Sequence, residues 1–143
     1  LPGNGLIKGD ARAFSKNTNT MIEQNMRQLV KGICESYGIS YEVKYETTCP
    51  MTFNQPKQAD AATKAAITLL GADKCDGDID PRPFSEDFSI MSENTPGCFV
   101  LMGNGVTGSH GRPLHSADYD FNDELLVQGS SYWVELAEQQ LQK

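Results

Sequence analysis

The first third of the chain shows two kinds of apolar periodicity. Residues 5–14 carry small or apolar side chains at every second position, which predicts a strand with one buried face. Apolar residues then recur at steps of three and four as far as Tyr37, which predicts a long amphipathic helix that Gly38 ends in a left-handed C-cap. Its start is ambiguous between Ser15 and Thr20, where N-cap residue types are frequent. Alternation returns over 41–47, so the order strand, helix, strand predicts a βαβ unit, half of a ferredoxin-like sandwich.

A connection between two prolines separates this unit from the rest of the chain. Pro50 and Pro56 flank an extended stretch, which predicts a domain boundary between residues 1–50 and 51–143. The Ala-rich residues 58–70 then predict a helix that a glycine closes. The acidic, turn-rich stretch that follows predicts mostly loop.

Three further elements are predicted towards the C-terminus. Ser85 precedes two acidic residues and Phe88, an order that predicts an N-cap and the first turn of a helix. The continuous apolar run at 98–102 predicts a strand buried on both faces. A last helix is predicted from about Asp123, with leucines and aromatic residues on one face. The mixture of helices and strands predicts the fold class α/β (mixed α+β). Because a buried strand needs neighbours on both sides, both halves look incomplete.

The charge balance excludes two classes of partner. The 143 residues carry 12 Lys and Arg against 19 Asp and Glu, a formal net charge of −7. A nucleic-acid binder needs a basic stripe and a membrane-surface protein needs a polybasic segment, so neither is expected. No apolar run approaches the roughly 20 residues of a membrane helix. The four cysteines lack CxxC spacing, and two disulfides are possible. Cys34 lies on the apolar face of the predicted helix and Cys98 in the apolar run, which favours reduced structural thiols in a cytoplasmic protein.

The residues best suited to chemistry lie in one Gly-rich loop near the C-terminus. His110 and His115 are the two histidines, and three aspartates lie within eight residues of His115. Imidazole and carboxylate groups bind zinc, manganese and similar ions, so this loop is a candidate metal site. The alternative is a solvated loop in which Asp120 and Asn122 cap the last helix. The loop lacks the GxxxxGK[ST] pattern of a phosphate-binding loop.

Five short motifs follow one another along the chain. They are GDARAF at Gly9 to Phe14, PMTFN at Pro50 to Asn54, SEDF at Ser85 to Phe88, PGCFVLMGNG at Pro96 to Gly105, and LHSADYDFNDE at Leu114 to Glu124. In this order they resemble the motifs of the amidohydrolase branch of the M20 metallopeptidases, whose last signature is LHxPxYDFND. That branch includes hippurate hydrolases, N-acyl-amino-acid amidohydrolases and hydrolases of auxin conjugates. The chain departs from the family at Ala117, where proline is usual, and in its compact sequence just before SEDF.

The resemblance implies a two-part architecture. Such enzymes have an α/β catalytic domain interrupted by a ferredoxin-like lid domain that dimerises. Residues 1–50 then correspond to half of the lid, and residues 51–143 to the C-terminal part of a zinc-peptidase-like α/β catalytic domain. The family segments D-x-H-x-C-G-H-D and G-E-E have no match here, and they supply four of five metal ligands and the general base. With Leu1-Pro2 resembling the end of the family's N-[VI]-[IL]-P, we expect a fragment without catalytic residues of its own, inactive without the N-terminal portion of the same protein.

Site residues follow from the same resemblance. His115 matches the remaining metal ligand of a site that holds two divalent ions, with zinc, manganese, cobalt and nickel all suited to such ligands. Asp120 and Asn122 are expected to position this loop, with helix capping as the alternative. Arg12 and Glu86 are candidates for substrate binding, although Arg12 could stabilise the sheet and Glu86 could complement a helix N-terminus. His110 has no family counterpart and is expected to lie at the surface.

The expected function is hydrolysis of the amide bond of an N-acyl amino acid by metal-activated water. The expected partners are a small N-acyl amino acid substrate and a second copy of the protein, bound through the lid. The alternative is a non-catalytic dimerisation or binding module derived from this family, which needs partner strands for its open sheet edges.

Overall fold

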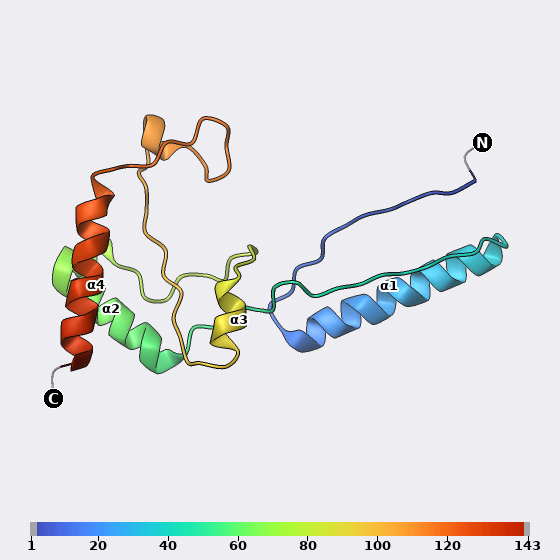
Figure 1. The fold of residues 1–143 in the computed structure, drawn as a ribbon, viewed down its shortest axis with the longest axis horizontal. Coiled ribbons are helices and arrows are strands. Elements are labelled where there is room, and N and C mark those ends of the chain that lie inside the picture. Colours follow the sequence, from blue (N-terminus) through green and yellow to red (C-terminus); the bar gives the residue numbers. More distant parts are fainter. Residues whose placement is uncertain (1–2, 142–143) are drawn as a thin grey trace. The chain divides into compact units, whose positions relative to one another are not determined.

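The computed structural model describes residues 3–141, and the regular secondary structure in this range is helical. Its elements, labelled in Figure 1 where there is room, are α1 (Lys16–Ser36), α2 (Pro56–Leu70), the 3₁₀ turn η1 (Ala72–Lys74), α3 (Phe88–Ser92), the 3₁₀ turn η2 (Ser109–Gly111) and α4 (Leu125–Leu141). The chain divides into two compact units: Leu1–Phe53 with Asp80–Thr95, and Asn54–Ile79 with Pro96–Lys143. The assignment of the two halves to a lid and a catalytic domain stays a prediction. Leu1-Pro2, one part of the resemblance, lies outside the described residues.

Helix α1 begins and ends where its capping residues allow. The Ser15 hydroxyl accepts a hydrogen bond of 3.0 Å from the Thr18 amide, which satisfies one of the free N–H groups of the first turn. At the other end, Gly38 has a φ of 66°, and the Ile39 amide reaches back 2.9 Å to the Cys34 carbonyl. This is a Schellman motif, in which a left-handed residue ends the helix. The helix predicted between the Ser15–Thr20 region and Tyr37 is therefore confirmed.

The segment that returns after α1 runs along the helix and is tied to it by side chains (Figure 1). Arg27 donates from Nη1 to the Val43 carbonyl at 3.0 Å. Asn19 donates to the Thr47 hydroxyl at 3.0 Å and accepts from the Tyr45 hydroxyl at 2.6 Å. The first unit is thus stabilised by polar contacts between a helix and an extended chain.

The strands predicted at 5–14, 41–47 and 98–102 do not pair with one another in the described part of the chain. The three segments belong to no helix, but a strand is stabilised by main-chain hydrogen bonds to a neighbour, and none of the three supplies such a ladder for another. The burial predicted for the segments 5–14 and 98–102 is also wrong. Ile7 is 98% exposed and Val100 is 42% exposed, because no second layer covers them among residues 3–141.

The apolar stripe of α1 is similarly uncovered. Met26, Leu29, Ile33 and Tyr37 are all exposed, from 42% at Met26 to 77% at Tyr37. An amphipathic helix is normally stabilised by packing of this face, so α1 depends here on its caps and on side-chain pairs such as Arg27 with Glu23 at 2.7 Å. No helix within residues 3–141 has both the length and the apolar character needed to cross a membrane.

The core of the second unit lies between α2 and α4, which pack against each other (Figure 1). Helix α2 begins two residues earlier than predicted because Pro56 occupies its first turn, where a missing N–H is tolerated. Ala62 and Ala65 are buried and allow α4 to approach closely, and Tyr132 of α4 is 6% exposed. The Trp133 ring meets the Tyr132 ring edge to face, with 5.4 Å between centroids.

The side chain of one asparagine, Asn54, makes hydrogen bonds to the backbone of the apolar run, of the kind that a neighbouring strand would make. The Asn54 side chain donates to the Phe99 carbonyl at 2.9 Å and accepts from the Phe99 amide at 2.8 Å. The Gln55 amide also donates to the Gly97 carbonyl at 3.0 Å. These bonds hold the start of the run against the entry to α2. Burial here raises the pKa of the Cys98 thiol, and all four cysteines are free.

Helix α3 is shorter than predicted and begins later. It spans Phe88–Ser92 with Asp87 at its N-cap, so the predicted cap at Ser85 is wrong. The buried Ser89 hydroxyl bonds to the Glu86 carbonyl at 2.5 Å, and the Ser89 amide donates to the same atom at 3.2 Å. These bonds between residues three apart fold the chain into a tight turn before the helix, which leaves the two acidic residues outside it.

Candidate functional site

His115 lies on a tight turn with an unusual backbone conformation. The Ser116 amide donates to the Pro113 carbonyl at 3.1 Å, which closes a four-residue turn with His115 at its third position. His115 has a φ of 70°, and it is the one non-glycine residue with positive φ in the described range. Its side chain is exposed. A residue held in this region at a cost in free energy is typical of a functional site.

An ion pair and a second backbone hydrogen bond stabilise the turn that contains His115. Arg112 and Asp118 form an ion pair of 3.0 Å across the turn, and the Tyr119 amide donates to the Ser116 carbonyl at 3.1 Å. The Ser116 hydroxyl is buried and has no hydrogen-bond partner among residues 3–141. The exposed imidazole of His115 is therefore displayed by a structured turn.

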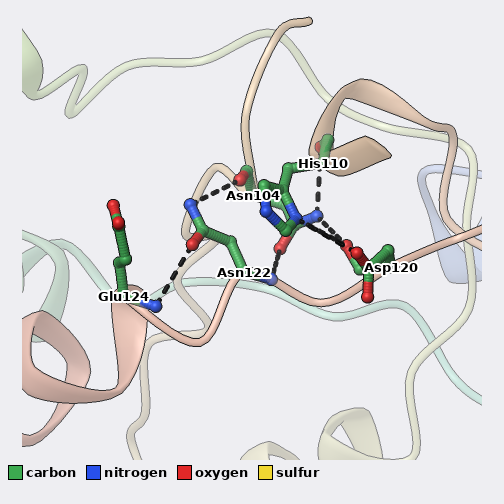
Figure 2. A network of polar contacts seen from close by, with 5 residues as sticks. All are labelled: Asn104, His110, Asp120, Asn122 and Glu124. Carbon is green, nitrogen blue, oxygen red and sulfur yellow. Dashed lines mark hydrogen bonds and ion pairs between the residues drawn. The ribbon is translucent and has the colours of Figure 1, made fainter. Parts of the chain in front are cut away.

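A network of polar contacts ties together the ends of the longer loop that contains this turn (Figure 2). The Asn104 side chain donates to the carbonyls of His110 at 3.0 Å and Asp120 at 2.8 Å. Its side-chain oxygen accepts from the Asn122 amide at 2.8 Å. The Asn122 side chain is a second donor to the same residue, to the Asn104 carbonyl at 3.3 Å. Figure 2 shows these residues converging from the two ends of the loop.

Two glycines allow the loop to close on itself. Gly105 has a φ of 149°, and a Cβ there would lie 2.9 Å from the Cβ of His110. A Cβ on Gly111 would lie 2.7 Å from the carbonyl carbon of Val106. Neither position has room for a side chain, so the glycines of this segment serve close approach of the backbone to itself.

Asn122 is found where the capping alternative places it. Its side-chain oxygen accepts from the Glu124 amide at 3.1 Å, and its carbonyl accepts from the Leu125 amide at 2.9 Å at the start of α4. Asp120 does not cap α4, because its carboxylate lies 3.8 Å from Nδ1 of His110. The hydrogen bonds of both residues shape the loop that carries His115, while a role in orienting a metal ligand stays a prediction.

His110 lies at the surface, as expected, but residue-type reasoning missed its contact with Asp120. Its side chain is 38% exposed, and Nδ1 lies 3.3 Å from the Asp120 carbonyl. Residue-type reasoning also missed Asn104, although the order Gly-Asn-Gly was a usable signal. An amide between two glycines can turn inwards and bond to backbone groups of its own loop.

The two candidates for substrate binding lie in the first unit. Arg12 forms an ion pair of 2.8 Å with Asp10 and donates to the Pro83 carbonyl at 3.2 Å, so it stabilises local structure there. The carbonyl of Glu86 accepts both bonds from Ser89, which shapes the turn before α3. A role in substrate binding stays a prediction for both residues.

The described residues provide one part of a metal site at most. No group of three or more His, Cys, Asp or Glu side chains within residues 3–141 is arranged to hold a metal ion. His115 offers one exposed imidazole, which fits the first ligand of a site completed by other groups.

Comparison with known proteins resolves the family. The model of the peptidase family M20/M25/M40 matches residues 5–139. The chain belongs to this family. The M20 resemblance read from the five motifs is therefore confirmed, and membership supports the α/β fold class even though the described residues are helical.

Several curated relatives align with nearly all of this M20 chain. It is 28% identical to the hippurate hydrolase of Campylobacter jejuni over 137 residues, which are 96% of the chain and 35% of that protein. It is 31% identical to the N-acetylcysteine deacetylase of Bacillus subtilis, in an alignment that covers 96% of the chain and 34% of that protein. It is 28% identical to thermostable carboxypeptidase 2 of Saccharolobus solfataricus, in an alignment that covers 91% of the chain and 33% of that protein. The chain thus spans about a third of the length of these relatives, and no solved structure matches it.

Proposed function

We propose that this M20 chain forms part of a metal-dependent amidohydrolase that cleaves the amide bond of N-acyl amino acids. The names of two relatives, hippurate hydrolase and N-acetylcysteine deacetylase, each refer to an N-acyl amino acid. The observation that carries the proposal is the left-handed turn at His115, which displays an exposed imidazole within the family's last motif. Backbone strain of this kind persists where a side chain has to be held in one place.

In this proposal His115 binds a metal ion through a ring nitrogen of its neutral imidazole. Zinc, manganese, cobalt and nickel all accept imidazole, and two such ions are expected in the complete site. When bound, the metal supplies Lewis-acid chemistry that polarises the amide carbonyl and activates water. The further ligands and the general base come from parts of the protein that these 143 residues do not include. The chain's own contribution is to hold His115 on a braced turn, so that little ordering is needed when the ion binds.

The test compares His115→Gln with the unchanged protein in its native full-length form. Glutamine keeps the size of the side chain and removes the ligand nitrogen. We expect bound metal per protein to fall, and hydrolysis of hippurate with added zinc or manganese to drop by at least 100-fold. Glu138→Gln, a change at an exposed side chain of α4 outside the loop, is the control and is expected to change neither quantity. Unchanged metal content in His115→Gln would contradict the proposal.

A non-catalytic dimerisation module is the second candidate, and the exposed apolar face of α1 favours it. The native mass separates the two. A natively expressed protein much heavier than 15.7 kDa, with a D-x-H-x-C-G-H-D segment, is expected for the enzyme. A native 15.7 kDa protein that dimerises without metal would instead support the module. Dimerisation through the lid half is part of either proposal.

A further inference from the structure

Asn104 uses every hydrogen-bonding group of its side chain on the loop that displays His115. Both donor bonds go to backbone carbonyls, those of His110 and Asp120, and the acceptor takes the Asn122 amide. An asparagine side chain offers two N–H donors on one nitrogen and one carbonyl oxygen, so this set is complete. The side chain is half-buried, where leaving such groups unpaired is unfavourable.

These bonds act at the two ends of the loop. Asn122 donates to Asn104 twice, from its backbone amide to the Asn104 side-chain oxygen and from its own side chain to the Asn104 carbonyl, so the two residues close the chain between them. His115 lies inside this closed stretch, 11 residues after Asn104 and 7 before Asn122, and makes none of these bonds itself. Closing a loop in advance removes part of the ordering that a ligand would otherwise have to bring about.

We propose that Asn104 is a positioning residue for the metal-binding function of His115: it closes the loop and so fixes where the imidazole is presented. This inference rests on the proposed function, because it assigns to Asn104 an effect on metal binding through His115. Residues that orient a metal ligand without touching the metal typically alter metal affinity by 10–100-fold.

The decisive variant is Asn104→Asp in the native full-length protein. Aspartate has nearly the same shape, but it loses both donors and sets a carboxylate against two carbonyl oxygens. We expect the zinc dissociation constant to rise 10–100-fold, with the number of ions bound at saturation unchanged and hydrolysis largely restored by excess zinc. A variant that is merely misfolded would not be restored by excess metal. Asn25→Asp, the same change at an exposed position of α1, is the control and is expected to change nothing.

A second measurement reports on the loop directly. Exchange of the Asn122 amide hydrogen with deuterium, measured without metal, is expected to accelerate in Asn104→Ala, which removes the oxygen that accepts this hydrogen, and to stay unchanged in Asn25→Ala. If Asn104→Asp does not fold, Asn122→Asp removes only the side-chain bond from Asn122 to the Asn104 carbonyl and should raise the zinc dissociation constant by a smaller factor.

The outcomes separate the inference from the proposed function. Loss of zinc binding in His115→Gln with unchanged affinity in the folded Asn104 or Asn122 variant would overturn the role of Asn104 alone. Unchanged zinc binding in His115→Gln would overturn the proposed function and this inference with it. Weaker zinc binding in both His115→Gln and Asn104→Asp, with rescue of the latter by excess zinc, is the expected result.

Discussion

At the scale of single residues, His115 combines an unfavourable left-handed backbone conformation with an imidazole that is exposed to solvent and open to a ligand. A left-handed conformation costs a residue with a Cβ about 1 kcal/mol, because the Cβ approaches the following carbonyl oxygen. The turn bond from Ser116 to Pro113 and the ion pair beside it hold the residue there. A fixed orientation of the imidazole favours metal binding, even though the strained backbone lowers the free energy of unfolding.

This account predicts that His115→Gly does not destabilise the chain. Glycine adopts positive φ readily, and its greater entropy in the unfolded state offsets part of that gain. The free energy of unfolding is therefore expected to stay equal or to rise by up to about 1 kcal/mol. Urea unfolding followed by the fluorescence of Trp133, the one tryptophan, measures this.

The matched control for that experiment is Leu114→Gly at the preceding position. Its φ is not positive, so glycine there brings only entropy of the unfolded chain and a loss of about 0.5–1 kcal/mol is expected. A fall in stability of His115→Gly as large as that of Leu114→Gly would show that the left-handed turn is not strained.

At the scale of elements, the two ends of α1 decide its length more than its packing does. Gly38 ends the helix in a left-handed conformation, while Gly32 lies inside it with open space around its Cα. The same substitution should therefore have opposite effects at the two glycines. Gly32→Ala is expected to raise the free energy of unfolding by about 1 kcal/mol through helix propensity, and Gly38→Ala to lower it by about as much.

Circular dichroism at 222 nm during urea unfolding measures both variants. Each serves as the control of the other, since both add one methyl group to α1 or its cap. Equal effects in the two variants would contradict the assignment of Gly38 as the residue that ends the helix.

The packing of α2 against α4 makes the second unit sensitive to alkaline pH. Burial raises the pKa of the Cys98 thiol, and burial followed by the charge of Cys98 raises the pKa of Tyr132. Above about pH 8.5 an exposed thiol in the unfolded chain loses its proton, while the folded chain still keeps it. Unfolding then releases a proton, so the free energy of unfolding is fully present at neutral pH and falls as the pH rises.

The expected result is a steady loss of stability as the pH rises above about 8.5, measured by urea unfolding with Trp133 fluorescence. Cys98→Ala should make the free energy of unfolding fall less steeply with pH, because it removes one of the two groups whose pKa burial raises. Cys75→Ala, in the same unit, is the control and should leave the slope as it is. A slope that Cys98→Ala does not change would assign the pH dependence to other groups.

At the scale of the whole molecule, the described residues leave much apolar surface uncovered. Ile7, Leu29 and Leu101 are more than half exposed, although each lies in a segment whose pattern predicts burial. The chain spans about a third of its curated relatives, and we propose that the rest of the protein covers these faces and completes the metal site.

The isolated 143-residue chain is accordingly expected to bind zinc weakly and to lack hydrolase activity. One imidazole cannot replace a full ligand set, on which the affinity of a metal site depends. Calorimetric titration with zinc is expected to show no binding at micromolar concentration, and the full-length protein under the same conditions is the positive control. Micromolar binding by the isolated chain that His115→Gln abolishes would contradict the need for ligands from outside.

The sequence by itself determined where the helices lie, how α1 ends, and the family. Ser15 and Gly38 act through local backbone geometry, which depends on neighbours a few residues away and can therefore be predicted from the sequence. His115 was found by residue type and motif. The spacing of five motifs also predicted the M20 family, which the family model confirms over residues 5–139.

Only the tertiary structure decided which residues meet across long stretches of chain. The alternating patterns predicted strands, but whether a strand pairs depends on a neighbour that the pattern does not contain, and residues 3–141 supply no ladder. Asn54 with Phe99, and Asn104 with Asp120 and Asn122, are likewise contacts between distant positions. Hydrogen bonds of this kind depend on how the chain folds back on itself, so residue type alone reveals neither the partners of Asn104 nor the contact of His110 with Asp120.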